Sequence, residues 1–510
     1  MAERTSTERG LVTAKSGVWL EHPASRYQRE YSLLNHFGMQ ANVIIAATYA
    51  NTKAESIVLS KKLIYAALQQ IGPQYPELGT TTFCRPSETK SGQHRRWSAF
   101  LQQINLDDHV KFINIPAEEE AKGLTATLER YHNLWFEPSI RPAWQLVVVN
   151  GRHVLFVYDH YITDGRGGTY ILESILDAIN SPKPELSNSS ILEFPTDIKG
   201  FPEVDPIKRA PAPLSLFQAI LNYLRFLAIW LLYRQKHLFF HDVVVKDLKM
   251  DYNNPQKEAN LVKTRLHSLR LDAPLMKKCL QACRSHQTTF TSLLHTLIKV
   301  TLAADFYPQA KFNHSTTVVD IRSYLKPHDR EKTMETAASI VSSWDWLPNF
   351  RKAGEQTASK ENAKFEANLL WELAYKHRAH VLNDMNHRKT CLTAWHSVDL
   401  LGHDEEDYIS GFIPGLKLCQ RNAFSLSNLG AFRPNHSICQ DGRNADWTIT
   451  NMEFSAGAYK TGYAANLVFN VTGVQDGPTA VHVCYEEGAL SDDFVDSVLE
   501  RIKMRMDAIV

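Results

Sequence analysis

The chain has 510 residues, of which 44% are hydrophobic and 22% are charged. These are ordinary values for a globular protein, so they exclude intrinsic disorder and the fibrous classes. Lys and Arg total 56 and Asp and Glu total 55, which leaves no basic excess to bind nucleic acid phosphates. We therefore expect no nucleic acid partner.

In the first half of the chain, apolar runs rich in β-branched residues alternate with stretches of helical periodicity. Ser60 is expected to cap a helix that Gly72 and Pro73 end. Asn150-Gly151 suits a two-residue type I′ hairpin turn, because both residues take positive φ readily. The predicted elements are strands over 40–49, 109–115, 144–149 and 153–158 and helices over 60–71 and 118–135.

The segment after the strand at 153–158 is a candidate catalytic motif. Its sequence is D-H-Y-I-T-D-G, from Asp159 to Gly165, and a helix is expected to begin near Thr169. A histidine at a strand end lies at a cleft rim, where an imidazole that titrates near pH 6.5 can accept and return a proton. Gly165 would let the chain turn sharply, and Asp164 would brace the loop. The residues alone also allow a loop histidine beside an Asx-turn aspartate.

A stretch rich in Pro, Ser and Asn at 180–213 predicts a connector. The apolar run at 214–233, LSLFQAILNYLRFLAIWLLY, predicts a helix that Arg225 interrupts. A membrane-spanning helix needs about 20 apolar residues, so we do not expect one here. Two interpretations remain: the helix covers part of the core, or it lays an apolar face on the endoplasmic reticulum membrane or a lipid droplet.

The second half continues with a mixture of helices and strands. We expect an N-terminal lobe over 1–200, a connector over 201–260 and a C-terminal lobe over 261–510. Ser491 is expected to cap the last helix. The other predicted elements are helices over 273–284, 291–303 and 353–388 and strands over 315–321, near Phe424, over 467–474 and over 480–485.

The cysteines and the opening residues bear on metal binding and location. Seven scattered cysteines are a poor disulfide framework and suit a reducing compartment. They show no C-x-x-C or Cys/His pairing at zinc spacing, so we expect no metal site. The opening segment, MAERTSTERGLVTAK, lacks the apolar core of a secretory signal. We expect a cytoplasmic monomer.

The motif in its setting, between a buried strand and a helix, resembles the H-H-x-x-x-D-G motif of the chloramphenicol-acetyltransferase-like superfamily. This superfamily includes BAHD acyltransferases, peptide-synthetase condensation domains and carnitine acyltransferases. The motif falls on His160, Asp164 and Gly165, with Asp159 in place of the first histidine. The D-F-G-W-G motif of plant BAHD enzymes and the S-T-S motif of carnitine enzymes are absent. Segments at 63–78 and 318–325 resemble the opening helix and a strand of this superfamily. The segment at 425–432 and the ending over 467–485 resemble its fungal alcohol acetyltransferase branch.

The resemblance implies an α/β fold of two lobes, each a mixed β-sheet with helices, with an active-site tunnel between them. It implies an O-acyltransferase that uses acyl-CoA, in particular acetyl-CoA, as co-substrate and holds no tightly bound cofactor. His160 would be the general base that activates a hydrophobic alcohol. A transferase acting on an amine, or a non-catalytic member that binds a hydrophobic metabolite, are the alternatives. Only Asp159 favours the non-catalytic alternative.

The resemblance also implies roles for residues around His160. Asp164 would form a structural ion pair rather than act as a triad acid, and Arg322 is its candidate partner, unless Arg322 is solvated. Ser427 and Asn428 could donate hydrogen bonds to the oxyanion or line the tunnel, or they could simply stabilise a turn. Asp159 could raise the pKa of His160, or it could point away from the imidazole.

Overall fold

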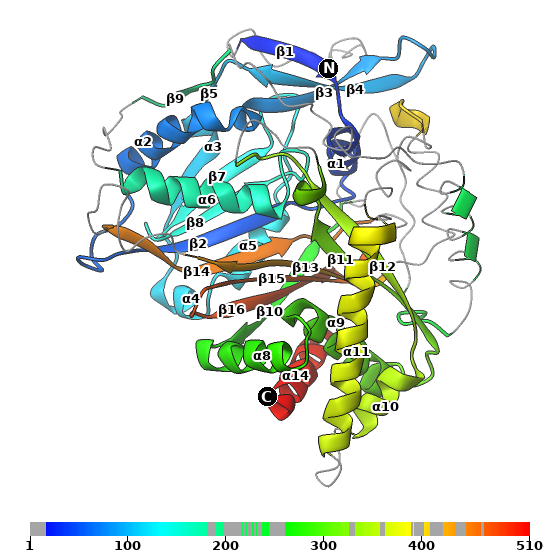
Figure 1. The fold of residues 1–510 in the computed structure, drawn as a ribbon. Helices are drawn as coiled ribbons and strands as arrows, with labels where there is room; N and C mark the ends of the chain where they lie inside the picture. The colour runs from blue at the N-terminus through cyan, green and yellow to red at the C-terminus, as the bar shows by residue number, and fades with distance from the viewer. Residues whose placement is uncertain are drawn as a thin grey trace.

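The computed structural model consists chiefly of two β-sheets with helices packed against them (Figure 1). The α/β fold with two sheet-containing lobes is confirmed. The structure describes residues 17–181, 189–196, 237–243, 261–325, 332–356, 363–388, 402–407, 422–433, 445–460 and 464–510, together with Phe217, Ile220, Leu221, Leu224, Leu227, Ala228, Leu231 and Cys391.

The first sheet has five strands, in the order β14 (Trp447–Ala456), β2 (Val43–Asn51), β8 (His153–Tyr158), β7 (Trp144–Val149) and β6 (Val110–Ile113). β7 and β8 form the predicted hairpin, and Asn150 and Gly151 in its turn have φ of 52° and 62°. Every residue of the two strands except His153 is buried, as their continuous apolar sequence predicts. Two helices pack on this sheet, α2 (Lys61–Ile71) and α6 (Gly165–Ile179) (Figure 1).

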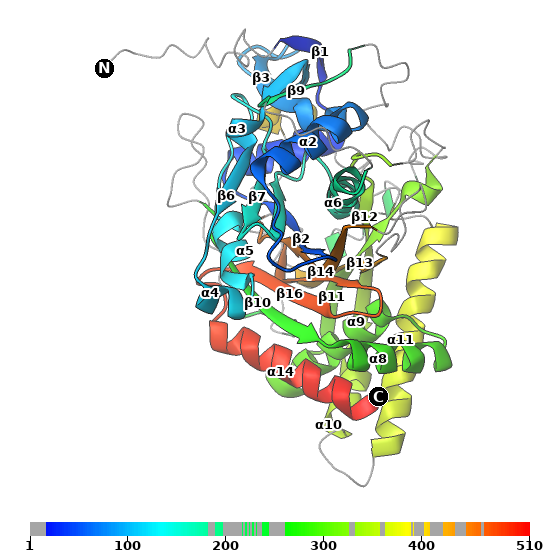
Figure 2. The ribbon, with the colours of Figure 1, turned by 90° about the vertical axis from the view of Figure 1, so that its left-hand side faces the viewer.

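The second sheet has six strands, in the order β10 (Thr264–Leu271), β16 (Thr479–Glu486), β15 (Ala465–Val474), β13 (Asn422–Phe432), β11 (Phe312–Asp320) and β12 (Ala338–Trp346). It is a mixed sheet, because β13 runs parallel to both of its neighbours and the other pairs are antiparallel. Figure 2 shows helices on the side remote from the first sheet: α8 (Ala273–Ser285), α9 (Phe290–Thr301), α11 (Ala363–Asn383) and α14 (Asp492–Ile509).

β14 joins the two sheets. It follows β13 in the chain, yet it pairs antiparallel with β2 of the first sheet along its whole length. It also packs against β15 of the second sheet. The lobes expected over 1–200 and 261–510 therefore exchange a strand, and most of the connector expected over 201–260 lies outside the described residues. Those domain bounds stay a prediction.

The N-terminal region adds smaller elements that the sequence patterns did not predict. Ser25 caps α1 (Arg26–His36) through its hydroxyl, which accepts a hydrogen bond from the Gln28 backbone N–H. α1 matters for function, because it lies against the cavity described below. The remaining strands form a three-stranded and a two-stranded sheet: β1 (Val18–Pro23), β4 (His94–Leu101) and β3 (Thr80–Pro86), and β5 (Gln103–Asn105) with β9 (Ile191–Glu193).

Three predicted helices have different bounds in the structure. The helix expected over 118–135 is two helices, α4 (Ala117–Ala121) and α5 (Thr125–His132), because Gly123 takes a φ of 84° between them. Of the helix expected over 353–388, the structure describes α10 (Pro348–Gln356) and α11, and residues 357–362 lie outside the described residues. α6 begins at Gly165 rather than near Thr169. The short α3 (Leu106–His109) precedes β6.

Part of the predicted apolar helix at 214–233 is described. Its seven described residues are helical, and six of them are large apolar side chains with exposed fractions between 37% and 73%. At 100° per residue these side chains fall on one side of the helix. No helix in the described part of the chain is long and apolar enough to cross a membrane. The six exposed side chains are Phe217, Ile220, Leu221, Leu224, Leu227 and Leu231.

Candidate active site

The sequence motif folds as a tight loop between β8 and α6. β8 lies in the middle of the first sheet and ends at Tyr158, so the sheet fixes the backbone that leads to His160. Asp164 caps α6, because its Oδ1 accepts a hydrogen bond from the Gly167 backbone N–H at 3.0 Å. This cap explains why α6 begins earlier than the sequence pattern indicates.

The glycines after Asp164 let α6 start close to the sheet. A Cβ atom on Gly168 would lie 2.7 Å from Ile45 Cγ1 and 2.8 Å from the Tyr158 hydroxyl. The sharp turn expected at Gly165 is not found, because Gly165 is the first residue of α6 and has no positive φ. Its lack of a side chain instead leaves room for Leu429, whose Cδ2 would be 2.9 Å from a Cβ there.

The predicted ion pair between Asp164 and Arg322 is confirmed. Arg322 Nη2 lies 2.9 Å from Asp164 Oδ1. The other carboxylate oxygen accepts a hydrogen bond from the Ala337 backbone N–H at 2.8 Å. Burial alone would raise the pKa of Asp164, but Arg322 and the backbone donors hold the pKa of this carboxylate below its usual value. Asp164 therefore ties α6 to the segments that flank β11 and β12.

Arg322 lies just after β11 rather than within it, in a 3-10 turn that spans Arg322–Tyr324. Its guanidinium also bonds to the Glu335 carbonyl at 2.6 Å and to Asp320 Oδ1 at 3.2 Å. Arg322 is thus held at the end of β11, and the Asp164 carboxylate is bonded to this part of the second lobe. These contacts match the structural role predicted for Asp164.

Asp159 does not act on His160 as a neighbouring negative charge. Its side chain is 2% exposed, and its Oδ1 accepts a hydrogen bond from the Tyr161 backbone N–H at 3.2 Å. Burial raises the pKa of Asp159 to about 8, so the neutral acid predominates near pH 7. Asp159 is also not among the groups that shift the pKa of His160. Of the two predicted alternatives, the structure favours the one in which Asp159 points away.

The His160 imidazole is held against an aromatic ring from α1. The rings of Tyr31 and His160 are stacked, with centroids 4.0 Å apart and planes at 4°. Burial lowers the pKa of His160 from its usual value, and nearby backbone groups and Asp164 offset this only in part. The neutral imidazole therefore predominates at neutral pH. A neutral imidazole has the lone pair that a general base needs.

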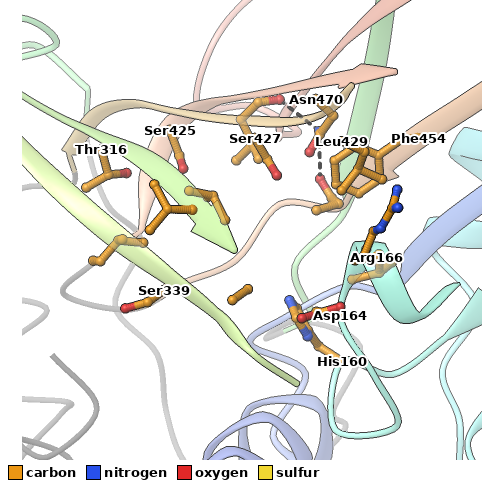
Figure 3. A pocket seen from close by; sticks show the side chains of 18 of the residues that line it. His160, Asp164, Arg166, Thr316, Ser339, Ser425, Ser427, Leu429, Phe454 and Asn470 are labelled. Carbon is orange, nitrogen blue, oxygen red and sulfur yellow. Dashed lines mark hydrogen bonds between the residues drawn. The ribbon is translucent and has the colours of Figure 1, made fainter. Parts of the chain in front are cut away.

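A cavity of about 530 Å³ lies beside His160. Its volume is within the usual range for sites that bind small organic molecules. One side is formed by α1 and the start of α6, and the other by β11, β12, β13 and β15 of the second sheet (Figure 3). Apolar side chains make up much of the wall: Leu34, Val43, Val318, Ile340, Leu429, Phe454 and Val468.

Ser427 and Asn428 both line the cavity, but only one has its polar side chain available. Asn428 Nδ2 donates to Thr291 Oγ1 at 2.9 Å, and Asn428 Oδ1 accepts from the Gly430 backbone N–H at 2.8 Å. Gly430 has a φ of 79° at an irregularity of β13 between Asn428 and Ala431, so Asn428 stabilises an irregular part of the strand rather than the predicted turn. The Ser427 hydroxyl has no hydrogen-bond partner within the described ranges, and Figure 3 shows it on the cavity wall.

The structure brings His160, Asp164, Arg322, Ser427 and Asn428 to a single cavity. Sequence patterns did not identify Tyr31, because nothing local to α1 indicates that it packs on a loop far along the chain. They also did not identify the polar residues of β11 and β13 that line the wall. No group of three or more His, Cys, Asp or Glu side chains suited to a metal ion occurs within the described residues.

Sequence comparison assigns the chain to a family. A family model described as alcohol acetyltransferase matches residues 118–500. The chain belongs to the alcohol acetyltransferase family. The fold and the family together make it an acyltransferase.

Two relatives of this alcohol acetyltransferase family member span most of its length. It is 22% identical over 433 residues to a Fusarium pseudograminearum protein described as the probable alcohol acetyltransferase FCK4, covering 79% of this chain and 78% of the relative. It is also 22% identical over 497 residues to an uncharacterised protein of Schizosaccharomyces pombe, covering 94% and 96%.

Solved structures share the fold of this family member. The TRI3 trichothecene 15-O-acetyltransferase from Fusarium sporotrichioides matches with a TM-score of 0.69 at 12% identity, over 98% of this chain and 99% of that one. The first condensation domain of the CDA synthetase matches with a TM-score of 0.57 at 11% identity, over 96% of each chain. These matches support the two-lobe architecture predicted from the sequence.

Proposed function

We propose that this protein transfers the acetyl group of acetyl-CoA to the hydroxyl group of a hydrophobic alcohol, with His160 as general base. The observation that carries the proposal is a neutral imidazole at the edge of a largely apolar cavity between the two sheets. The family match and the likeness to an O-acetyltransferase support the choice of acetyl group and alcohol.

In the proposed reaction the His160 imidazole accepts the proton of the acceptor hydroxyl as the oxygen attacks the thioester carbonyl. The tetrahedral intermediate carries a negative oxygen, to which Ser427 is the proposed hydrogen-bond donor. The carbon–sulfur bond then breaks, and the imidazolium returns its proton to the leaving thiolate. Ester and free CoA result, and His160 ends neutral. Asp164 and Arg322 would act by holding the loop, not by moving a proton.

The function is tested by following thiol release from acetyl-CoA with a panel of alkanols, terpenoid alcohols and primary amines. We expect release that depends on an alcohol and produces the corresponding acetate ester. Release with amines alone would replace the proposal with N-acetyl transfer. Release with no acceptor in the panel, although the protein is folded, would favour a member that only binds its ligand.

We also propose that the helix containing Phe217 and Leu231 docks the protein on a membrane surface or lipid droplet. The six exposed apolar side chains on one helical face support this proposal, because contiguous exposed apolar surface marks an interaction site. In the sequence the helix is followed by Arg234 and Lys236, which suit an anionic lipid surface. A hydrophobic acceptor would concentrate in the same lipid.

Co-sedimentation with phosphatidylcholine–phosphatidylserine vesicles tests the docking proposal. We expect wild-type protein to sediment with the vesicles, and the triple variant Phe217→Ser, Ile220→Ser, Leu224→Ser to stay in the supernatant with unchanged thermal stability. A control triple variant at exposed apolar residues elsewhere, Ile57→Ser, Ile140→Ser and Met504→Ser, should sediment like wild type. Wild-type protein that remains in the supernatant would contradict the proposal.

A further inference from the structure

Two hydroxyl side chains stand side by side on the cavity wall of the second sheet. Thr316 on β11 and Ser425 on β13 are register partners in the parallel pair of these strands. Both line the cavity, and Figure 3 shows them on the part of the wall away from His160. We call Thr316 and Ser425 the hydroxyl pair. The pair is separate from His160 and Ser427, which serve the proposed chemistry.

The hydroxyl pair has hydrogen-bonding capacity that the protein does not use. Thr316 is 2% exposed and Ser425 is 5% exposed, yet neither hydroxyl has a hydrogen-bond partner in the part of the chain that the structure describes. Two other polar groups on the same wall are bonded within the protein: Ser339 donates to the Cys391 carbonyl, and Asn428 uses both ends of its amide. The Ser427 hydroxyl resembles the pair in having no partner among the described residues. Both hydroxyl oxygens of the pair are open to the cavity rather than enclosed by protein, so a cavity occupant can form hydrogen bonds with them.

The surroundings of the hydroxyl pair are apolar. Val318 follows Thr316 on the same face of β11, and Val468 is the register partner of Ser425 on β15. Ile340, opposite Val318, extends this surface. Such a wall suits a carbon skeleton that carries a polar group at one defined position. A hydrocarbon chain would leave both hydroxyls without partners, which costs binding free energy.

The size of the cavity indicates which substrate meets this wall. About 530 Å³ is within the range of cavities that bind one small organic molecule. Only the thioester end of acyl-CoA has to reach His160, whereas the acceptor has to lie beside it. Most of the wall is therefore left to the acceptor.

We infer that the hydroxyl pair binds a second oxygen function of the acceptor, so that the acceptor is an oxygenated apolar alcohol rather than a simple alkanol. This inference rests on the proposed function, because it takes His160 as the place where the first hydroxyl reacts. The pair then fixes which hydroxyl of such an acceptor is acetylated. It makes Thr316 and Ser425 determinants of specificity, not of chemistry.

The experiment compares 1-alkanols with α,ω-alkanediols of the same length, from four to twelve carbons, as acceptors. We expect kcat/KM of wild-type enzyme to favour the diol by about 3- to 10-fold at one range of lengths, beyond the twofold statistical factor, because the second hydroxyl then reaches the pair. Thr316→Val and Ser425→Ala should each reduce that preference, and the double variant should abolish it. Turnover of the alkanols should remain.

A control removes a buried hydroxyl from the same sheet outside the cavity. Ser343 lies on β12, is 3% exposed, and its Oγ has no partner among the described residues, so Ser343→Ala should keep the diol preference. An equal response to diols and alkanols at every length would overturn the inference. So would a rise in KM for acetyl-CoA alone in the two hydroxyl variants, because the pair would then serve the thioester arm.

The inference can fail separately from the proposed function. Thermal stabilisation by the same alcohols, measured without acetyl-CoA, should be larger for diols of the favoured length than for alkanols, and should lose this difference in the double variant. If wild-type enzyme shows this binding pattern but no acetyl transfer, the inference stands and the proposed reaction is wrong. If it acetylates alkanols without any diol preference in binding or rate, the reaction stands and the inference is wrong.

Discussion

The two faces of β11 border different environments: one face lines the cavity, and the other contacts two buried histidines. On one face Thr316 and Val318 line the cavity opposite His160. On the other face, Thr317 Oγ1 contacts His377 Nε2 at 3.2 Å and Ser315 Oγ contacts His295 Nε2 at 3.2 Å. The rings of His295 and His377 stack with centroids 3.8 Å apart. One sheet therefore separates a site with a half-buried histidine, His160, from a site with two buried ones.

The difference between the sites lies in access rather than in the histidines. Burial lowers the pKa of His160, and it lowers the pKa of His295 and His377 as well. Neither burial nor a lowered pKa therefore identifies a catalytic histidine in this protein. His160 faces a cavity, whereas His377 contacts Ser292 and Thr317 hydroxyls on its two ring nitrogens. The first arrangement leaves room for a substrate, and the second stabilises packing.

The largest expected effect is the loss of activity on removing the cavity histidine. His160→Ala should lower kcat/KM by about 10²–10⁴-fold, because it removes the general base. Its free energy of unfolding should change little, because the imidazole borders a cavity. Steady-state thiol release and urea unfolding measure the two quantities. An activity close to that of wild type would remove His160 from the proposed mechanism.

On the other face of the sheet we expect the opposite result. His377→Ala should lower the free energy of unfolding by about 1–3 kcal/mol, because it leaves a void, leaves the Thr317 hydroxyl without a partner and removes one of the two hydrogen bonds of the Ser292 hydroxyl. The kcat/KM of the folded fraction should stay within about threefold of wild type. A loss of activity similar to that of His160→Ala, in a protein of normal stability, would show that the two sites are not separate.

The smallest expected effects are changes with pH: a change in activity for the His160 site, and a change in the free energy of unfolding for the site of His295 and His377. Activity of folded enzyme should rise with pH through a pKa below 6.5 and then level off, because protonated His160 cannot accept a proton. His295 and His377 have lowered pKa values in the folded state. Their neutral forms therefore stabilise the fold above about pH 6.5, and this contribution is lost as the pH falls below that value.

Urea unfolding at pH 7 and pH 5 measures the stability part of this prediction. Wild type should lose more free energy of unfolding between these values than His377→Ala does, although Lys299 and His380 also face the pair and contribute to its electrostatics. Equal losses in both proteins would show that the histidine pair does not titrate on unfolding.

The sequence predicted those parts of the site that depend on local pattern. The continuous apolar runs at 144–149 and 153–158, with Asn150-Gly151 between them, were enough to place His160 at the end of a buried strand. The Ser60 and Ser491 caps were also recognisable, and both hydroxyls accept a hydrogen bond from the backbone N–H three residues on. The ion pair between Asp164 and Arg322 was expected from family resemblance, not from pattern.

The parts that were missed depend on contacts between distant segments. The sequence of α1 does not indicate that Tyr31 stacks on His160, because ring stacking leaves no periodic signal. The hydroxyl pair is defined by the register of two parallel strands that are far apart in the chain. A polar residue in a strand normally indicates a solvent-facing position, so Thr316 and Ser425 could not be assigned to an interior wall.

The exchange of β14 has a consequence for how the protein unfolds. β2 is an apolar strand, VIIAATYAN, and without β14 one of its long edges would have no partner in the described sheet. An unpaired apolar edge is prone to pair with other chains, so an isolated N-terminal half would aggregate. We therefore expect the two sheets to melt in a single cooperative transition.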